Sequence, residues 1–238
     1  MRSPTHSNSK TLKKRLCILF LTHKINTYSF LSIGRSLRVQ LVRQTLSFEE
    51  FNLSYGDDNR YELIDGELIK MEPTGLHEQI AAFVSRKLNV EIDRLNLALF
   101  IPHRCLIKLL GTETAFRPDI IVLDKTQLQN EPLWQQEPII TLGSSIKLVV
   151  EVVSSNWQND YARKFEDYAV LGISEYWIVD YLGVGGREYL GKPKQPTITI
   201  CTIEDGEYKR HLFRDSKLLV SPNFPELQLT GKQIFTSV

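Results

Sequence analysis

Ile146-Lys-Leu-Val-Val-Glu-Val-Val153 is a run of apolar, mostly β-branched residues that contains one carboxylate, Glu151. A run of this composition predicts a strand that is buried on both faces of a sheet. A lone carboxylate in such a strand carries a large desolvation penalty, so it requires a partner or a cation. Glu151 is therefore the first candidate for a functional residue.

An aspartate and a lysine extend this pattern on either side of the strand. Asp119 ends the tripeptide Arg117-Pro-Asp119 and precedes a second β-branched run, Ile120-Ile-Val122, while Lys164 follows Glu151 by thirteen residues. Two acids on two buried strands, followed by a lysine, indicate a site for a hard divalent metal. Carboxylate oxygens suit Mg²⁺ or Mn²⁺ better than they suit zinc.

Turn and cap signals divide the rest of the chain into alternating helices and strands. Asp65-Gly66 and Asp205-Gly206 each predict a hairpin, and Gly172 predicts the end of a helix over about 159–171. The other expected elements are a short helix capped by Thr45 or Ser47, a helix from His77 to about Leu95, strands over 97–101, 105–109 and 176–180, and a polar surface excursion over 127–141. This order predicts an α/β fold with a mixed sheet.

Charge divides the chain near residue 44. Nine of the 29 Lys and Arg residues lie in residues 1–44, which contain no Asp or Glu. The other 20 basic residues are outnumbered by all 28 acidic residues, so residues 45–238 carry a formal net charge of −8. A domain boundary is expected here, with one domain over 45–238.

Three interpretations of residues 1–44 remain open. A basic arm could hold phosphate backbones, and an organelle transit peptide would also be basic and free of acids. The interpretation we favour is an over-extended start or a disordered extension, because the segment lacks clear periodicity. The apolar stretch over 16–21 is shorter than the ~20 residues that span a bilayer, so no membrane insertion is expected.

The cysteines indicate a reducing compartment, and we expect a cytoplasmic protein. Cys17, Cys105 and Cys201 are odd in number and lack the paired spacing of a disulfide framework or a zinc site. The histidines likewise do not cluster at zinc spacings.

Several short motifs, in order, resemble one nuclease family. They are Tyr61-Glu-Leu-Ile-Asp-Gly-Glu-Leu68, Arg117-Pro-Asp119, Val150-Glu-Val-Val-Ser154, Asp160-Tyr-Ala-Arg-Lys164, Tyr168, Gly172, Ser174-Glu-Tyr-Trp-Ile-Val-Asp180 and Ser221-Pro-Asn-Phe-Pro225. Together they resemble the PD-(D/E)XK nuclease superfamily and, within it, a large bacterial family of restriction-endonuclease-like proteins. The resemblance spans about Thr45 to Phe235. It implies a restriction-endonuclease-like core, with a central mixed sheet flanked by helices and added β-hairpins.

The chain departs from the superfamily pattern at one position. A Glu-X-Lys motif would place the lysine at position 153, which is Val153. In the closer family the lysine comes from the following helix, where Lys164 stands. An ordinary ion pair between Asp160 and Lys164, four residues apart on a helix, also explains both residues.

The resemblance implies a metal-dependent endonuclease that hydrolyses phosphodiester bonds of DNA. Asp119, Glu151 and the carbonyl of Val152 would hold Mg²⁺ or Mn²⁺, and Lys164 would orient the attacking water or stabilise the transition state. His77 and Tyr168 are further catalytic candidates. Glu67 is a weaker candidate.

Other functions are compatible with the same motifs. One is a nucleic-acid-binding or regulatory module that kept the fold and lost cleavage, and another is a nuclease acting on RNA or structured DNA. For the endonuclease interpretation we expect DNA as a partner, and a homodimer is compatible with it.

Overall fold

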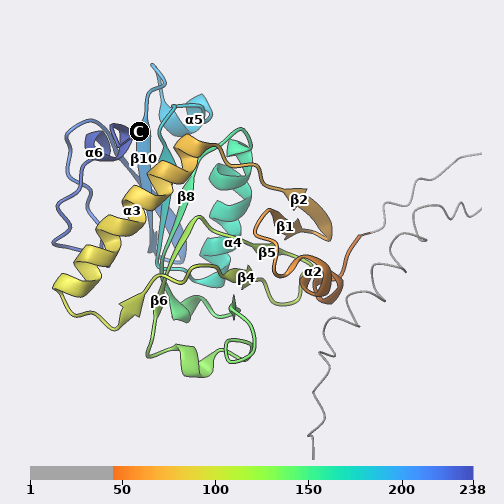
Figure 1. Cartoon of the computed structure of the whole chain (residues 1–238). Helices are drawn as coiled ribbons and strands as arrows, with labels where there is room; N and C mark the ends of the chain where they lie inside the picture. Colours follow the sequence, from red (N-terminus) through yellow and green to blue (C-terminus); the bar gives the residue numbers. More distant parts are fainter. Residues whose placement is uncertain (1–44, 238) are drawn as a thin grey trace, which may run out of the picture.

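Two mixed β-sheets organise the part of the chain that the computed structural model describes, residues 45–237. The five-stranded sheet has the order β2-β1-β5-β4-β7, and the six-stranded sheet has the order β11-β10-β9-β8-β6-β3. Helices flank the sheets (Figure 1), which confirms the predicted α/β class. The basic segment over 1–44 lies outside the described residues.

The elements follow the predicted order closely. The strands are β1 Tyr61–Ile64, β2 Glu67–Lys70, β3 Leu99–Phe100, β4 Leu106–Lys108, β5 Ala115–Phe116, β6 Ile120–Asp124, β7 Ile139–Ile140, β8 Ile146–Val152, β9 Glu175–Asp180, β10 Thr197–Glu204 and β11 Glu207–Phe213. The helices are α2 Phe48–Tyr55, α3 Gly75–Arg94, a π-helix Asn159–Arg163, α4 Lys164–Leu171, α5 Arg187–Leu190 and α6 Gly231–Phe235, with single 3₁₀ turns at Leu128–Asn130 and Gly143–Ser145.

The central strands of the six-stranded sheet, β6, β8 and β9, are buried on both faces, as their apolar runs predict. Alternate residues of a strand point to opposite faces. In β6, Ile120 and Val122 pack in one core cluster with the apolar side of α3, whereas Ile121 and Leu123 pack in another cluster with residues that include Tyr168 of α4. The sheet is therefore sandwiched between α3 and α4, and every side chain of β6 is buried.

The five-stranded sheet is smaller and packs against α2, beside the main body in Figure 1. Ser47 begins α2 with a capping box, in which its side chain accepts from the Glu50 amide and the Glu50 side chain accepts from the Ser47 amide. The β1–β2 hairpin turns at Asp65, whose φ is 50°, and Gly66, whose φ is 79°. The predicted excursion over 127–141 includes β7, which pairs in parallel with β4.

The last hairpin forms one edge of the six-stranded sheet. β10 pairs with β11 across Asp205 and Gly206, as predicted. β11 is the terminal strand, and Lys209, Arg210 and His211 are exposed in its middle. No helix within residues 45–237 is both long and apolar enough to cross a membrane.

Candidate active site

The register of β6 and β8 sets Asp119 beside Glu151. The two strands pair antiparallel, with Ile120 opposite Val150 and Ile121 opposite Val149. Continuing this register by one residue places Asp119 opposite Glu151. Both residues have the strand parity of Ile121 and Val149, which belong to the core cluster that contains Tyr168 of α4. The two acids therefore share one face of the sheet at its end.

Glu151 is the most deeply buried of the predicted site residues that carry charge. It is 3% exposed. The Tyr168 hydroxyl donates to its Oε1 at 2.8 Å, and Lys164 Nζ lies 3.1 Å from the same oxygen. Burial raises the pKa of Glu151 well above its ordinary value, Lys164 opposes this, and the negative charge of Asp119 adds to it. A charged Glu151 is therefore costly at this position without a cation beside it.

Lys164 lies among three carboxylates. Its Nζ is 3.1 Å from Glu151 Oε1, 3.2 Å from Glu62 Oε1 and 3.7 Å from Asp160 Oδ1. Burial would lower the pKa of Lys164, but these carboxylates, Glu151 first, outweigh it and hold the pKa well above its ordinary value. The ammonium is therefore a fixed cation. Its contact with Asp160 along the helix is the longest of the three.

Glu62 is a site residue that the sequence reading missed. It lies in β1 of the five-stranded sheet and is 2% exposed. Its Oε1 accepts the amide N–H of Arg117 at 2.7 Å as well as contacting Lys164. One oxygen thus connects the segment that leads into Asp119 with the helix that carries Lys164. Because side chains alternate along a strand, Glu62 lies on the same face as Ile64. An acid on the apolar face of this strand is the sequence feature that could have identified Glu62 as a candidate.

The Arg117 side chain lines the cavity but is bound by backbone carbonyls rather than by the site acids. Its Nη2 donates to the carbonyls of Gly56 at 2.8 Å and Tyr55 at 3.2 Å, and its Nε donates to the carbonyl of Tyr61 at 3.0 Å. Arg117 therefore ties α2 and β1 to the strand that follows.

Asp119 is held by an amide and a histidine. Its Oδ2 accepts from the Val152 amide at 2.7 Å and lies 3.2 Å from His77 Nε2. Thr74 caps α3 by accepting from the His77 amide, which places the imidazole at the start of the helix. Burial would lower the pKa of His77, but the hydrogen bond and charge of Asp119 raise it above its ordinary value. The Asp119 side chain is 23% exposed, so it is the more accessible of the two predicted metal ligands.

A π-helix directly precedes Lys164. It spans Asn159–Arg163, and π-helical segments occur frequently at functional sites. The Tyr176 hydroxyl donates to the Asp160 carbonyl at 2.9 Å and supports this segment from β9. Burial, together with the negative charges nearby, raises the pKa of Asp160 to about 7 even though Lys164 opposes it. On its outer side, Arg163 makes two hydrogen bonds to Asp65, at 2.7 and 2.8 Å, and so joins the helix to the β1–β2 turn.

These residues line one cavity of about 440 Å³. The acids Glu62, Asp119, Glu151 and Asp160 lie in its lining together with His77 and Lys164. Tyr168 is fully buried beneath Glu151 and does not line the cavity. Glu67 is exposed in β2 and also does not line it. Five of the predicted residues, Asp119, Glu151, Val152, Lys164 and His77, are thus brought together around a space that a substrate can enter.

The donor set fits a magnesium-like ion that shares its shell with water and substrate. Within residues 45–237 no group of three or more His, Cys, Asp or Glu side chains is arranged to hold a metal by itself. Mg²⁺ typically takes one or two protein carboxylates and completes its shell with waters or phosphate oxygens. Asp119, Glu151 and the Val152 carbonyl would supply such a partial shell.

Comparisons with known proteins agree with this architecture. The crystal structure of a putative nuclease belonging to DUF820 from Anabaena variabilis matches with a TM-score of 0.59 and 20% sequence identity, over 81% of this chain and 98% of that one. At this identity the likeness shows the fold alone. No curated protein matches the sequence. A family model described as Uma2, putative restriction endonuclease, matches residues 48–231, and the chain belongs to this family.

Proposed function

We propose that this protein is a metal-dependent endonuclease that hydrolyses phosphodiester bonds of DNA. The observation that carries the proposal is the meeting of Asp119 and Glu151 at the ends of β6 and β8, with Lys164 Nζ 3.1 Å from Glu151, in the lining of one cavity. Membership of the Uma2 family supports the same reaction class.

The acids would bind a divalent metal ion. Mg²⁺ or Mn²⁺, when bound, lowers the pKa of a coordinated water and polarises a phosphate oxygen. Asp119 and Glu151 would hold it, with the Val152 carbonyl as a third protein ligand. His77 would orient Asp119 through the contact at Oδ2, and the Tyr168 hydroxyl would fix Glu151 in the same way. Ligand orientation by such outer partners is common in metal sites.

Lys164 would act on the phosphate that enters the cavity. Its charge is fixed by three carboxylates, so it is suited to offset negative charge that develops on the phosphate or to orient the attacking water. Because its pKa is raised, it is less suited to accept a proton as a base. We therefore assign it an electrostatic role.

Cleavage assays on the full chain test the proposal. Supercoiled plasmid, single-stranded DNA and RNA would each be incubated with Mg²⁺, with Mn²⁺ and with a chelator. We expect metal-dependent nicking of plasmid, absent in Asp119→Ala. Cleavage of RNA alone would replace DNA as the substrate. Binding without cleavage in either metal, by a protein that circular dichroism shows to be folded, would instead identify a silent binding module.

A further inference from the structure

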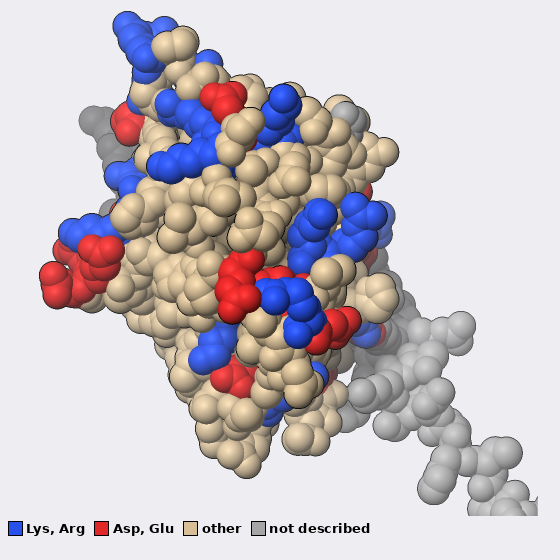
Figure 2. Space-filling view, turned by 90° about the vertical axis from the view of Figure 1, so that its left-hand side faces the viewer, with Lys and Arg blue, Asp and Glu red and all other residues tan. Residues whose placement is uncertain are grey.

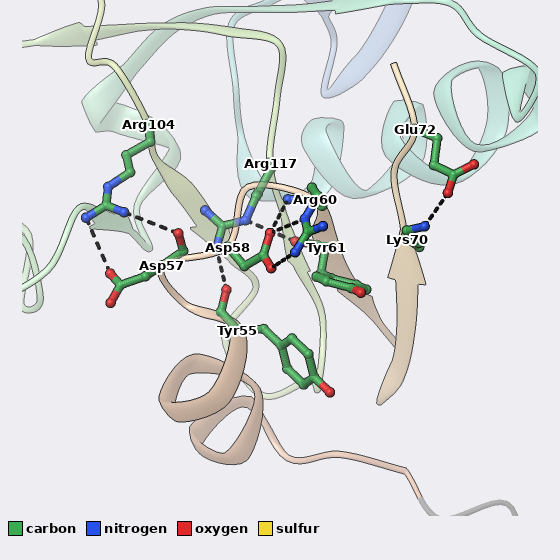
Figure 3. Close-up of polar contacts among 9 residues, drawn as sticks. All are labelled: Tyr55, Asp57, Asp58, Arg60, Tyr61, Lys70, Glu72, Arg104 and Arg117. Atoms are coloured by element: carbon green, nitrogen blue, oxygen red, sulfur yellow. Dashed lines mark hydrogen bonds and ion pairs between the residues drawn. The ribbon is translucent and has the colours of Figure 1, made fainter. Parts of the chain in front are cut away.

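Three basic side chains at the cavity are each paired with an acid close by (Figure 3). Arg60 makes a two-point contact with Asp58, at 2.9 Å from Nε and 2.7 Å from Nη2. Arg104 Nη2 lies 3.3 Å from Asp57 Oδ1. Lys70 Nζ pairs with Glu72 two residues further along the chain. Arg60, Lys70 and Arg104 all line the cavity whose lining also includes Glu62, Asp119, Glu151 and Asp160.

These ion pairs are exposed, unlike the network around Lys164. The side chains of Arg60, Lys70 and Arg104 are 67%, 53% and 44% exposed, whereas that of Lys164 is 5% exposed. Exposed ion pairs contribute little to stability, because water screens both charges. A phosphate can therefore replace the carboxylate in such a pair at small cost, and a guanidinium binds both groups through the same two-point geometry.

The three residues come from the side of the cavity formed by the five-stranded sheet. Arg60 directly precedes β1, Lys70 ends β2, and Arg104 lies two residues before β4. Asp119 and Glu151 belong to the six-stranded sheet. A strand whose phosphate reaches these acids therefore has the basic side chains within the same cavity to receive its backbone.

The basic side chains at the cavity contrast with the net negative charge of residues 45–238. Residues 45–238 carry a formal net charge of −8, which does not favour a general attraction to nucleic acid. The face in Figure 2 shows basic and acidic side chains in small groups, separated by wide uncharged areas. Binding of a phosphate backbone to this part of the chain requires a local arrangement rather than a broad basic surface.

We propose that Arg60, Lys70 and Arg104 bind the phosphodiester backbone of the strand that flanks the scissile phosphate, and that Asp58, Glu72 and Asp57 occupy the phosphate positions until the strand displaces them. The proposal rests on the nuclease function and adds a binding site to it. The two members of each ion pair should therefore affect nucleic-acid binding in opposite directions. Removing a basic residue weakens nucleic-acid binding, and removing its acidic partner strengthens it.

Binding measurements on full-length protein with the Asp119→Ala change, which prevents cleavage, test this opposition of sign. Fluorescence anisotropy with labelled single-stranded and duplex oligonucleotides would be recorded from about 50 to about 200 mM salt. We expect Arg60→Ala and Arg104→Ala each to weaken binding about three- to tenfold and to reduce the salt slope by about 0.7 to 0.9. We expect Asp58→Asn and Asp57→Asn each to tighten binding about two- to fivefold at low salt.

Lys209→Ala and Glu207→Gln are matched controls, because both residues are exposed on β11 and neither lines the cavity. Neither control should change affinity. Unchanged affinity and salt slope in the Arg60 and Arg104 variants would overturn the inference, and so would weaker binding in the Asp58 variant. If the wild-type chain still cleaves DNA in either case, the proposed function stands. If the wild-type chain neither binds nor cleaves any nucleic acid, the proposed function itself fails.

Discussion

The two sheets contribute to the cavity in different ways. The six-stranded sheet has long central strands covered on both faces, and it sets Asp119 and Glu151 side by side through strand register. The five-stranded sheet has strands of two to four residues packed on α2, and it supplies Glu62 and the residues Arg60 and Lys70. The six-stranded sheet thus holds the two acids, while the smaller sheet supplies Glu62, which contacts Lys164, and basic side chains that line the cavity. Variants of the acids should therefore affect the proposed reaction itself, and variants in the five-stranded sheet should affect how the site is arranged.

The largest effect is expected at Lys164, where both sheets meet. Lys164→Ala should lower the cleavage rate by ~10²–10³, the scale seen when one preorganised charge-stabilising group is removed. It should also lower the free energy of unfolding by ~3–5 kcal/mol, since Glu62, Glu151 and Asp160 lose their shared cation. Single-turnover kinetics and urea unfolding would measure the two effects.

Lys147→Ala is the control for this change, because Lys147 lies in β8 with Glu151 but pairs with Asp124 at 3.2 Å. Its side chain is 36% exposed, so its loss should change little. A Lys164→Ala protein as active as wild type would show that the buried cation is structural.

A smaller effect is expected at Glu62, which tests the role of the five-stranded sheet directly. Glu62→Gln keeps an acceptor for the Arg117 amide but removes the charge beside Lys164. We expect kcat to fall about 10- to 100-fold, as with lost outer partners of a site, with KM changed little. Glu67→Gln, in the neighbouring strand of the same hairpin, should keep normal kcat. Equal losses in the two variants would mean that the hairpin matters only as a whole.

The next effect concerns stability without metal and depends on pH. The folded pKa of Asp160 is about 7, above its ordinary value of 3.8. The folded state therefore binds this proton more tightly than the unfolded state does, and the stabilisation is lost as pH rises from about 4 through about 7. Thermal unfolding in chelator should show a Tm that falls by a few degrees between pH 5 and about pH 8. Asp160→Asn should flatten this dependence, and a slope that persists in the variant would assign it to other groups.

The smallest effect is expected at the contact between the π-helix and the β1–β2 turn, outside the cavity. Arg163 and Asp65 are 35% and 61% exposed, so their two hydrogen bonds should contribute only ~0.2–1 kcal/mol. A double-mutant cycle with Arg163→Ala and Asp65→Ala would measure the coupling by urea unfolding. A coupling well above this range would indicate that the hairpin depends on the π-helix for its position.

Sequence patterns predicted the six-stranded sheet better than the five-stranded one. The runs around Asp119 and Glu151 are long enough to identify buried strands, and the Asp205-Gly206 turn fixes the last hairpin. β5 and β7 contain two residues each, which is too short for any period to show, and their pairing depends on distant segments. The division into two sheets was likewise absent from local patterns.

The site residues likewise differ in how well the sequence predicted them, according to the sheet that they belong to or contact. Asp119 and Glu151 stand out because charges in or beside apolar runs demand a partner, whereas Lys164 was identified through the family resemblance, and the structure brings the three together. Glu62 lies in a short hairpin in which Glu67, and not Glu62, was a predicted candidate. Only the packing of β1 against the Arg117 segment makes Glu62 a neighbour of Lys164. A single sequence does not encode that contact in its spacing.

The charged outer edge of β11 has a consequence for self-association. A terminal strand of seven residues exposes backbone donors and acceptors that another chain could extend, the usual start of edge-to-edge aggregation. Consecutive Lys209, Arg210 and His211 oppose a like-charged copy at that edge. Two molecules that approach there would bring equal charges together in a new intermolecular sheet. This charge disfavours edge-to-edge pairing of two copies through β11.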